Sequence, residues 1–153
     1  MIEHNLDRLE PFLSRIAEAL SSRERKGLLT KIGQSLRRSN SARIAANVQP
    51  DGTAMVGRRP RPGSSKRGKM FRQLRQARIL KVRATADQVS IGFVGQAQQV
   101  AQVHHFGQED EVGRTRDGRT IRARYVARQL LGFHADDEAQ TFEAIEKHLS
   151  RDR

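Results

Sequence analysis

The segment 57–69, which reads GRRPRPGSSKRGK, constrains the fold more than any other part of the chain. Its glycines and prolines interrupt both helical and strand hydrogen bonding, and no apolar periodicity runs through it. We therefore expect a mobile basic loop at 57–69, with regular elements before and after it. At 153 residues the chain has the length of an ordinary domain, and we expect a single domain over 1–153.

Most of the excess positive charge lies in one stretch around this loop. Residues 58–83 hold eleven of the 29 Lys and Arg residues and no acid, so the rest of the chain holds 18 basic and 17 acidic residues. Such a density of positive charge would bind phosphate backbones by counterion release. Phe71 is the one aromatic residue in the stretch, so it offers no platform for stacking single-stranded bases. The stretch is therefore either a contact for DNA or a solvated loop that orders against an acidic protein partner.

The composition excludes several classes of protein. Cysteine is absent, which removes disulfides and thiolate metal sites. No apolar run approaches the ~20 residues that cross a bilayer, and the N-terminus lacks the apolar core of a signal peptide. We expect a soluble protein that is made in the cytoplasm and has no membrane partner. With 36% hydrophobic and 5% aromatic residues, its core should be thin, and the chain should either leave some segments loose or complete its core against a partner.

Apolar spacing predicts an α+β fold, in which N-terminal helices and a C-terminal helix pack on a small antiparallel β-sheet. Alternating apolar residues predict a hairpin over 79–95, and a second is predicted over 114–126 with Asp117 and Gly118 at its tip. Helical periodicity runs over 3–20, then from the serines at 21–22 towards Val48, and again over 70–79, 96–106 and 135–153.

The segment 100–112, VAQVHHFGQEDEV, contains the residues that most suggest chemistry. His104 and His105 are adjacent, so they point to different faces of a helix or strand and cannot easily share a metal ion. We expect one packed and one exposed histidine, and no metal site. The chain also lacks a G-x-S-x-G elbow and a cysteine nucleophile. We therefore expect no catalytic residue and no cofactor.

The same segment has a structural interpretation. We expect the end of a short helix in which Val100, Val103 and Phe106 pack inward and Gly107 turns the chain. Residues 108–111 should then leave as an acidic loop that is available to a basic neighbour. The segment Arg58–Lys69 of an adjacent subunit is one candidate for that neighbour.

Five segments, in this order and at about this spacing, resemble the phage virion morphogenesis proteins, also called tail completion proteins, of Mu-like and related temperate tailed phages. They are PDGT (50–53), KMFRQLR (69–75), VSIGFVG (89–95), VAQVHHFGQEDEV (100–112) and RYVARQLLGF (124–133). The family usually has glutamine where His105 stands and proline where Val126 stands. It also commonly has Trp and Pro after the Asp-Gly turn, where this chain reads AMVGRRP.

The resemblance implies a structural protein without enzymatic activity. Such a protein completes the tail at its head-proximal end, as a tail completion or neck ring subunit, and supports head-tail joining. Its implied partners are further copies of itself in a ring, commonly six-fold, together with tail tube and connector proteins. Its implied place is the virion tail or neck, after assembly in the cytoplasm of a bacterium that carries a phage or a prophage. The alternative from composition is a small basic nucleic-acid-binding protein.

The resemblance also marks positions in this chain. The positions with an implied structural role in the motifs are Asp51, Gly52, Gly92, Phe93, Gly95, His104, His105, Phe106, Gly107, Arg124, Tyr125, Arg128, Leu130, Leu131 and Gly132. Basic side chains of the loop would face either DNA in the lumen of a ring or acidic faces of the tube or connector. These are Arg58, Arg59, Arg61, Lys66, Arg67 and Lys69.

Overall fold

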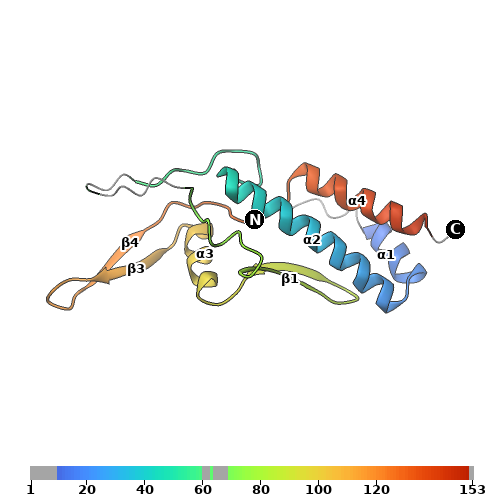
Figure 1. The fold of residues 1–153 in the computed structure, drawn as a ribbon, viewed down its shortest axis with the longest axis horizontal. Helices are drawn as coiled ribbons and strands as arrows, with labels where there is room; N and C mark the ends of the chain where they lie inside the picture. The colour runs from blue at the N-terminus through green and yellow to red at the C-terminus, as the bar shows by residue number, and fades with distance from the viewer. Residues whose placement is uncertain (1–9, 60–62, 64–68, 152–153) are drawn as a thin grey trace. The chain divides into compact units, whose positions relative to one another are not determined.

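The computed structural model describes residues 10–59, Gly63 and residues 69–151 (Figure 1). The predicted start of the first helix and most of the predicted loop, including Arg61, Lys66 and Arg67, lie outside these residues. The α+β class is confirmed, with none of the described helices long and apolar enough to cross a membrane. The elements are α1 (Glu10–Ala19), α2 (Ser22–Ala46), β1 (Leu80–Ala84), β2 (Val89–Phe93), α3 (Gln96–Phe106), β3 (Glu109–Arg114), β4 (Thr120–Arg124) and α4 (Ala135–Leu149).

The chain divides into two compact units, and each is built from separated segments. Unit 1 comprises Met1–Ser39, Lys81–Gly92 and Phe133–Arg153, and unit 2 comprises Asn40–Leu80 and Phe93–Gly132. The strands pair as two sheets of two strands each, β1 with β2 and β3 with β4, where a single small sheet was expected. The expectation of one domain over 1–153 stays a prediction.

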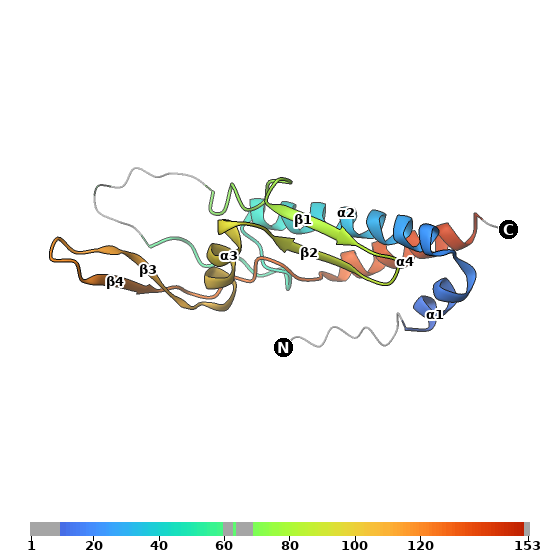
Figure 2. The ribbon, with the colours of Figure 1, turned by 90° about the horizontal axis from the view of Figure 1, so that it is seen from below.

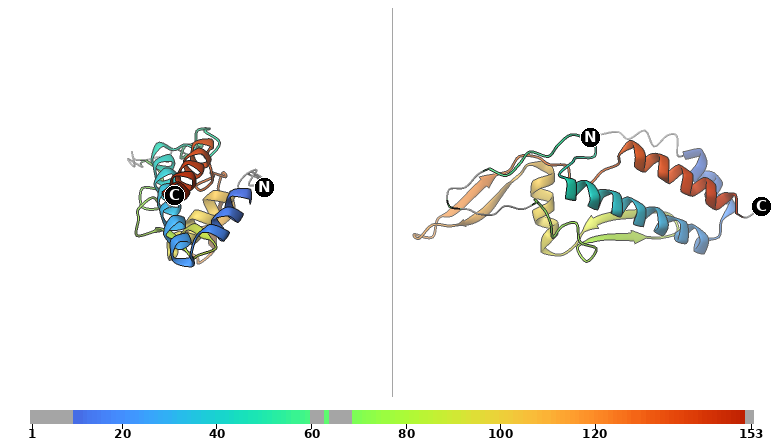
Figure 3. Two further views of the ribbon diagram at one scale, coloured as in Figure 1. Left: turned by 90° about the vertical axis from the view of Figure 1, so that its right-hand side faces the viewer. Right: turned by 45° about the horizontal axis from the view of Figure 1, so that its top comes forward.

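In unit 1, one apolar cluster joins α2 to α4 and to the β1–β2 hairpin. The start of α2 is fixed by a capping box, because Ser21 N donates to Glu24 Oε2 (2.8 Å) and Glu24 N donates to Ser21 Oγ (3.3 Å). Figure 3 shows α4 beside α2. The buried residues of this cluster are Leu20, Leu28, Ile32, Leu36 and Ile145.

The β1–β2 hairpin lies along α2 (Figure 2), and a glycine makes this close approach possible. A Cβ on Gly33 would lie 2.5 Å from Cγ1 of Val82 and 2.6 Å from Cγ2 of Val89. Arg25 ties the helix to the hairpin turn, because its Nε donates to the Ala86 carbonyl at 3.2 Å. The glycine that weakens the helix by propensity therefore allows the packing that holds it.

In unit 2, the buried cluster gathers residues from α2, α3 and three connecting segments. Its members are Ile44, Met55, Met70, Leu74, Ala101 and Leu130. The predicted helix over 70–79 is wrong, since these residues form successive turns. Phe71 has a φ of 60°, a left-handed conformation that a helix does not contain. Met70 and Leu74 are nevertheless buried. The apolar spacing therefore identified residues that pack in the core, although they do not form a helix.

The β3–β4 hairpin of unit 2 is longer than the sequence indicates. Its tip lies at Asp117 and Gly118 as predicted, but β3 begins at Glu109, so the predicted acidic loop over 108–111 is wrong. The register places Glu109 opposite Arg124 and Glu111 opposite Arg122, with a bulge between Glu111 and Gly113. Opposite charges therefore face one another across the two strands, an arrangement that a strand tolerates well.

Candidate functional site

The candidate site is the motif segment 125–132, an irregular stretch of unit 2 that follows β4. It contains no helix or strand, so its backbone must find partners elsewhere. Side chains and carbonyls from other parts of the unit supply them. The donors and acceptors are Arg128 N to His104 O (2.8 Å), Gln129 N to Gln49 Oε1 (3.0 Å), Leu130 N to His105 Nδ1 (3.2 Å) and Gly132 N to Asn40 Oδ1 (3.0 Å).

The two histidines hold this segment from the last turn of α3. Both are half-buried, so the expectation of one packed and one exposed histidine is wrong. Burial lowers the pKa of both, and the positive charges of Arg128 and Arg58 lower the pKa of His104 further. The structure requires the neutral form of His105, because its Nδ1 must be unprotonated to accept a hydrogen bond from Leu130 N.

His104 also stands between two aromatic rings. Its imidazole makes edge contacts with Phe71 (centroids 5.0 Å apart) and with Tyr125 (4.4 Å apart). The left-handed φ of Phe71 therefore belongs to the residue that packs against the motif histidine. Within residues 10–59, 63 and 69–151, no three His, Cys, Asp or Glu side chains come close enough to form a metal site.

Arg128 links the motif segment to the start of the basic loop. Its guanidinium is buried and donates to the carbonyls of Val56 (2.6 Å), Gly57 (3.1 Å) and Val126 (3.3 Å). Burial lowers the pKa of Arg128, and the charge of Arg58 lowers it further. Carbonyl oxygens thus solvate this buried cation, and in return it fixes the backbone directly before Arg58.

Two glycines of the motifs are required by close approach. Gly107 ends α3 with a left-handed φ of 66°, and a Cβ there would lie 2.8 Å from the backbone nitrogen of Ala127. A Cβ on Gly132 would lie 2.6 Å from Cγ of Pro50. Pro50 precedes the turn in which Thr53 N donates to Asp51 Oδ1 (2.9 Å). The PDGT, HHFG and RYVARQLLG motifs therefore meet at one place.

The structure also locates the remaining motif positions. Leu130 is buried in the cluster of unit 2, Phe93 packs against that cluster, and Leu131 is half-buried. Gly95 precedes α3 with a φ of 65°, and Gly52 has a φ of 86° in the PDGT turn. Two motif positions are elsewhere: Gly92 belongs to unit 1 and Arg124 is exposed at the end of β4.

Sequence reasoning missed three side chains that hold the segment: Asn40, Arg43 and Gln49. Arg43 donates to the Gly132 carbonyl at 2.7 Å and to Asn40 Oδ1 at 2.9 Å. Asn40 lies between Leu36 and Ile44 on the apolar stripe of α2, and it is 3% exposed. A polar residue at a buried position of an apolar stripe must be hydrogen-bonded. The asparagine within this stripe was therefore the sequence signal that could have identified the contact.

Two apolar side chains of α3 that were expected to pack inward are exposed on the surface near the motifs. Val103 is buried as predicted, but Val100 is 44% exposed and Phe106 is 64% exposed, so their predicted inward packing is wrong. Phe106 rests its ring edge on His105 at a centroid distance of 4.7 Å. Other exposed large apolar side chains of unit 2 are Val56, Val112, Ile121 and Val126.

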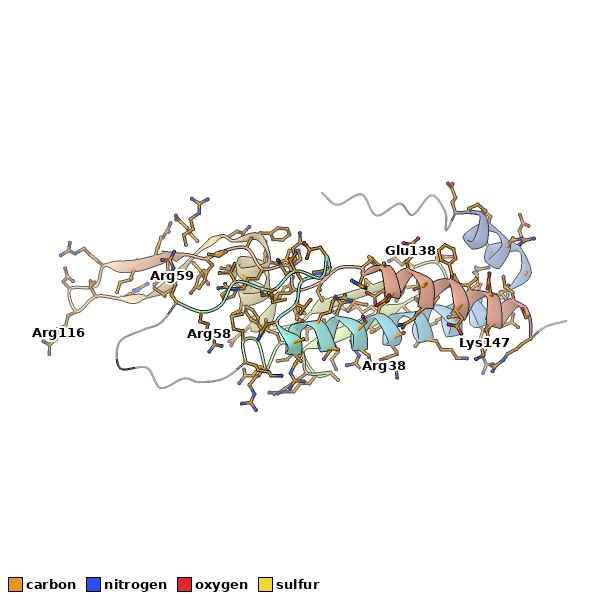
Figure 4. All side chains as sticks on the ribbon, turned by 90° about the horizontal axis from the view of Figure 1, so that it is seen from above. Arg38, Arg58, Arg59, Arg116, Glu138 and Lys147 are labelled. Atoms are coloured by element: carbon orange, nitrogen blue, oxygen red, sulfur yellow. The ribbon has the colours of Figure 1, made fainter. Side chains whose placement is uncertain are left out.

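Charge is divided unequally between the units. Unit 2 holds 16 of the basic and 5 of the acidic residues, a net of +11, whereas unit 1 holds 13 and 12, a net of +1. Of the basic loop residues predicted as contacts, Arg58, Arg59 and Lys69 are exposed and form no ion pair with another described residue. Figure 4 shows Arg58, and Arg116 of the β3–β4 hairpin, extending from the ribbon.

Comparison with known proteins found one family and one relative that match almost the whole chain. Residues 4–150 match the model of the phage virion morphogenesis family. The tail completion protein S of Escherichia phage P2 is 36% identical over 149 residues, which cover 94% of this chain and 97% of that protein. No solved structure matches.

Proposed function

The chain belongs to the phage virion morphogenesis family, and from that premise we propose that it completes the phage tail at its head-proximal end and supports head-tail joining. The observation that carries the proposal is the similarity to tail completion protein S along almost the whole of both chains. The place of action is then the tail or neck of a virion that is assembled in the bacterial cytoplasm.

The protein acts through protein contacts, as a subunit of a homo-oligomeric ring, commonly of six copies, that meets the tail tube and the connector. The structure supports this with apolar side chains that unit 2 leaves exposed beside a fixed scaffold. Phe106, the residue between His105 and Gly107, is the largest of them and is 64% exposed. Aromatic residues of this exposure are enriched where protein surfaces meet.

Enzymatic activity and a cofactor are not part of the proposal. Two polar motif side chains, those of His105 and Arg128, are engaged with the backbone of their own unit. His105 accepts from Leu130 N, and Arg128 donates to three carbonyls. Their hydrogen-bonding capacity is used to hold a loop, which is a structural role.

A deletion of the gene in the phage or prophage tests the function. After induction, electron microscopy should show filled heads and separate tails, and expression of the gene in trans should restore joined virions. Mass spectrometry of purified virions should find the protein in the particles. Normal yields of joined virions from the deletion strain would overturn the proposal.

One observation favours a second function, that of a basic nucleic-acid-binding protein: the net charge of +11 on unit 2. The two functions are compatible if the basic side chains face DNA that passes through the ring. A duplex of mixed sequence should then bind weakly, and affinity should fall steeply with salt. Tight binding that survives ~200 mM salt and discriminates among sequences would favour the second function.

The substitution Arg58→Gln with Arg59→Gln and Lys69→Gln should flatten that salt dependence, by about 0.9 in the logarithmic slope for each phosphate that the variant no longer neutralises. A matched control removes three exposed charges from unit 1: Lys31→Gln, Arg38→Gln and Lys147→Gln. An equal fall in affinity for both variants would show that the whole surface binds and that unit 2 has no special part.

A further inference from the structure

The β3–β4 hairpin of unit 2 has two unpaired edges, and the charges on its two strands differ in sign. Among the residues that the structure describes, each strand pairs with the other alone, so the outer edge of each offers free backbone groups. Strand β3 begins with Glu109, Asp110 and Glu111. Strand β4 carries Arg122 and Arg124 and no acid. The hairpin therefore has an acidic edge and a basic edge.

The register places these charges on one face. Glu109 is opposite Arg124 and Glu111 is opposite Arg122, and directly opposed residues point to the same side of a sheet. All four side chains are exposed. Arg114 takes Glu111 as its partner at 3.2 Å, and neither Arg122 nor Arg124 forms an ion pair with another described residue. The guanidinium groups of β4 are thus available to a carboxylate from outside the hairpin.

We propose that the acidic β3 edge of one copy lies against the basic β4 edge of the next copy, so that the chains associate head to tail through their hairpins. This inference rests on the proposed function, which requires a homo-oligomer. The hairpin itself selects a second copy as its partner, because the acidic edge of one copy is complementary to the basic edge of another.

The charge pattern also selects the arrangement. An isologous contact would bring β3 against β3 or β4 against β4, and like charges directly opposite one another are destabilising. A contact of β3 with β4 pairs the acids at the start of β3 with the arginines at the end of β4. Contacts of unlike surfaces repeat around an axis and close into a ring when the rotation allows it. A two-fold dimer through this hairpin is therefore disfavoured.

Apolar surface lies beside the charges and gives the contact a second component. Val112 stands at the bulge of β3 and is 43% exposed, and Ile121 on β4 is 44% exposed. The N–H of Glu111 already donates to Asp110 Oδ1 at 2.9 Å. The contact therefore depends on side-chain charge and apolar burial more than on a complete backbone ladder.

Charge reversal tests the arrangement by complementation. The variant Glu109→Arg with Glu111→Arg makes both edges basic, and Arg122→Glu with Arg124→Glu makes both edges acidic. Each alone should associate on the order of tenfold more weakly than the wild type by sedimentation velocity. An equimolar mixture of the two should regain association, because each edge of one variant then meets its opposite on the other.

The variant that combines all four substitutions is the control for damage to the hairpin itself. It exchanges the charges of the two strands, so the opposition within the hairpin and between copies is kept, and it should associate like the wild type. Association of the wild type should also weaken as salt is added. The hairpin contact is overturned if the wild type associates and the two reversed variants associate equally well, or if their mixture shows no recovery. A ring that forms through another surface is compatible with either result. A wild type that stays monomeric alone and with tail tubes would overturn the ring as well.

Discussion

Arg128 and His104 meet twice: the Arg128 N–H donates to the His104 carbonyl at 2.8 Å, and the guanidinium lies 3.4 Å from the imidazole Nδ1. The RYVARQLLG motif is thereby fixed to the end of α3. The same guanidinium holds the carbonyls of Val56 and Gly57, so one buried side chain joins three segments that are remote in sequence.

Arg128→Met should therefore destabilise unit 2 although it removes a buried charge. The variant keeps much of the side-chain volume but leaves the carbonyls of Val56 and Gly57 without their donor. Each hydrogen bond from a charged donor contributes about 1.5–3 kcal/mol, and water replaces part of the two that are lost at these exposed residues, so we expect a loss of about 2–4 kcal/mol in the free energy of unfolding. Urea denaturation measures it, and Arg124→Met, at an exposed position of the same motif, is the control. Equal stability of both variants would contradict the anchoring role.

The stability of the protein should fall on acidification below about pH 6.5, the ordinary pKa of histidine. Burial lowers the pKa of His104 and His105, so the unfolded chain takes up protons at a higher pH than the folded chain does. The stability is full above the unfolded pKa and is lost as pH falls through the lower folded pKa. Thermal melts between pH 5 and pH 8 follow the effect.

The variant His105→Gln isolates one of the two histidines. A glutamine oxygen can accept from Leu130 N as His105 Nδ1 does, and it does not titrate in this range. We expect stability close to the wild type at pH 7.5 and a shallower decline towards pH 5. An unchanged decline would show that His105 does not contribute to it.

The two glycines of α2 should respond to alanine in opposite directions. Gly33→Ala places a methyl group 2.5 Å from Val82 Cγ1, and we expect a loss of about 1–3 kcal/mol. Gly27→Ala meets nothing within 4 Å and should gain about 0.5–1 kcal/mol from helix propensity. Denaturant midpoints of both variants give the comparison. Stabilisation by both would mean that the hairpin does not press on the helix at Gly33.

Phe106→Ser should separate assembly from folding. The ring is 64% exposed, so its removal should change the free energy of unfolding by less than about 1 kcal/mol. We expect loss of complementation in the deletion strain, because an apolar contact with a neighbouring protein would be gone. Val103→Ala is the matched comparison: at 1% exposure it should lower stability by about 1–3 kcal/mol. Full complementation by Phe106→Ser would remove this residue from the proposed interface.

The parts of the fold that the sequence predicted are those set by local patterns. α2 begins directly after the N-cap serine Ser21, α3 ends before Gly107, and the hairpin tip falls at Asp117 and Gly118. Each of these depends on residues a few positions apart. Local periodicity and turn chemistry are sufficient for such features.

The features that were missed depend on contacts across long stretches of chain. The acidic sequence of β3 led to the prediction of a loop. Arg122 and Arg124, which lie opposite its acids, can be identified as neighbours only from the strand register. The turns over 70–79 follow from the left-handed Phe71, whose ring packs on His104. At the site, sequence motifs marked Arg128, but no local pattern showed that Val56 and Gly57 accept its hydrogen bonds.

The interleaved segments of the two units determine the order in which each can be completed during synthesis. Every residue of unit 2 precedes Phe133, so unit 2 has all its chain before α4 is translated. Unit 1 must wait, because Ile145 of α4 is a member of its buried cluster with Leu28 and Ile32. Helix α2 leaves the ribosome with an open apolar face, and α4 is the helix that covers it.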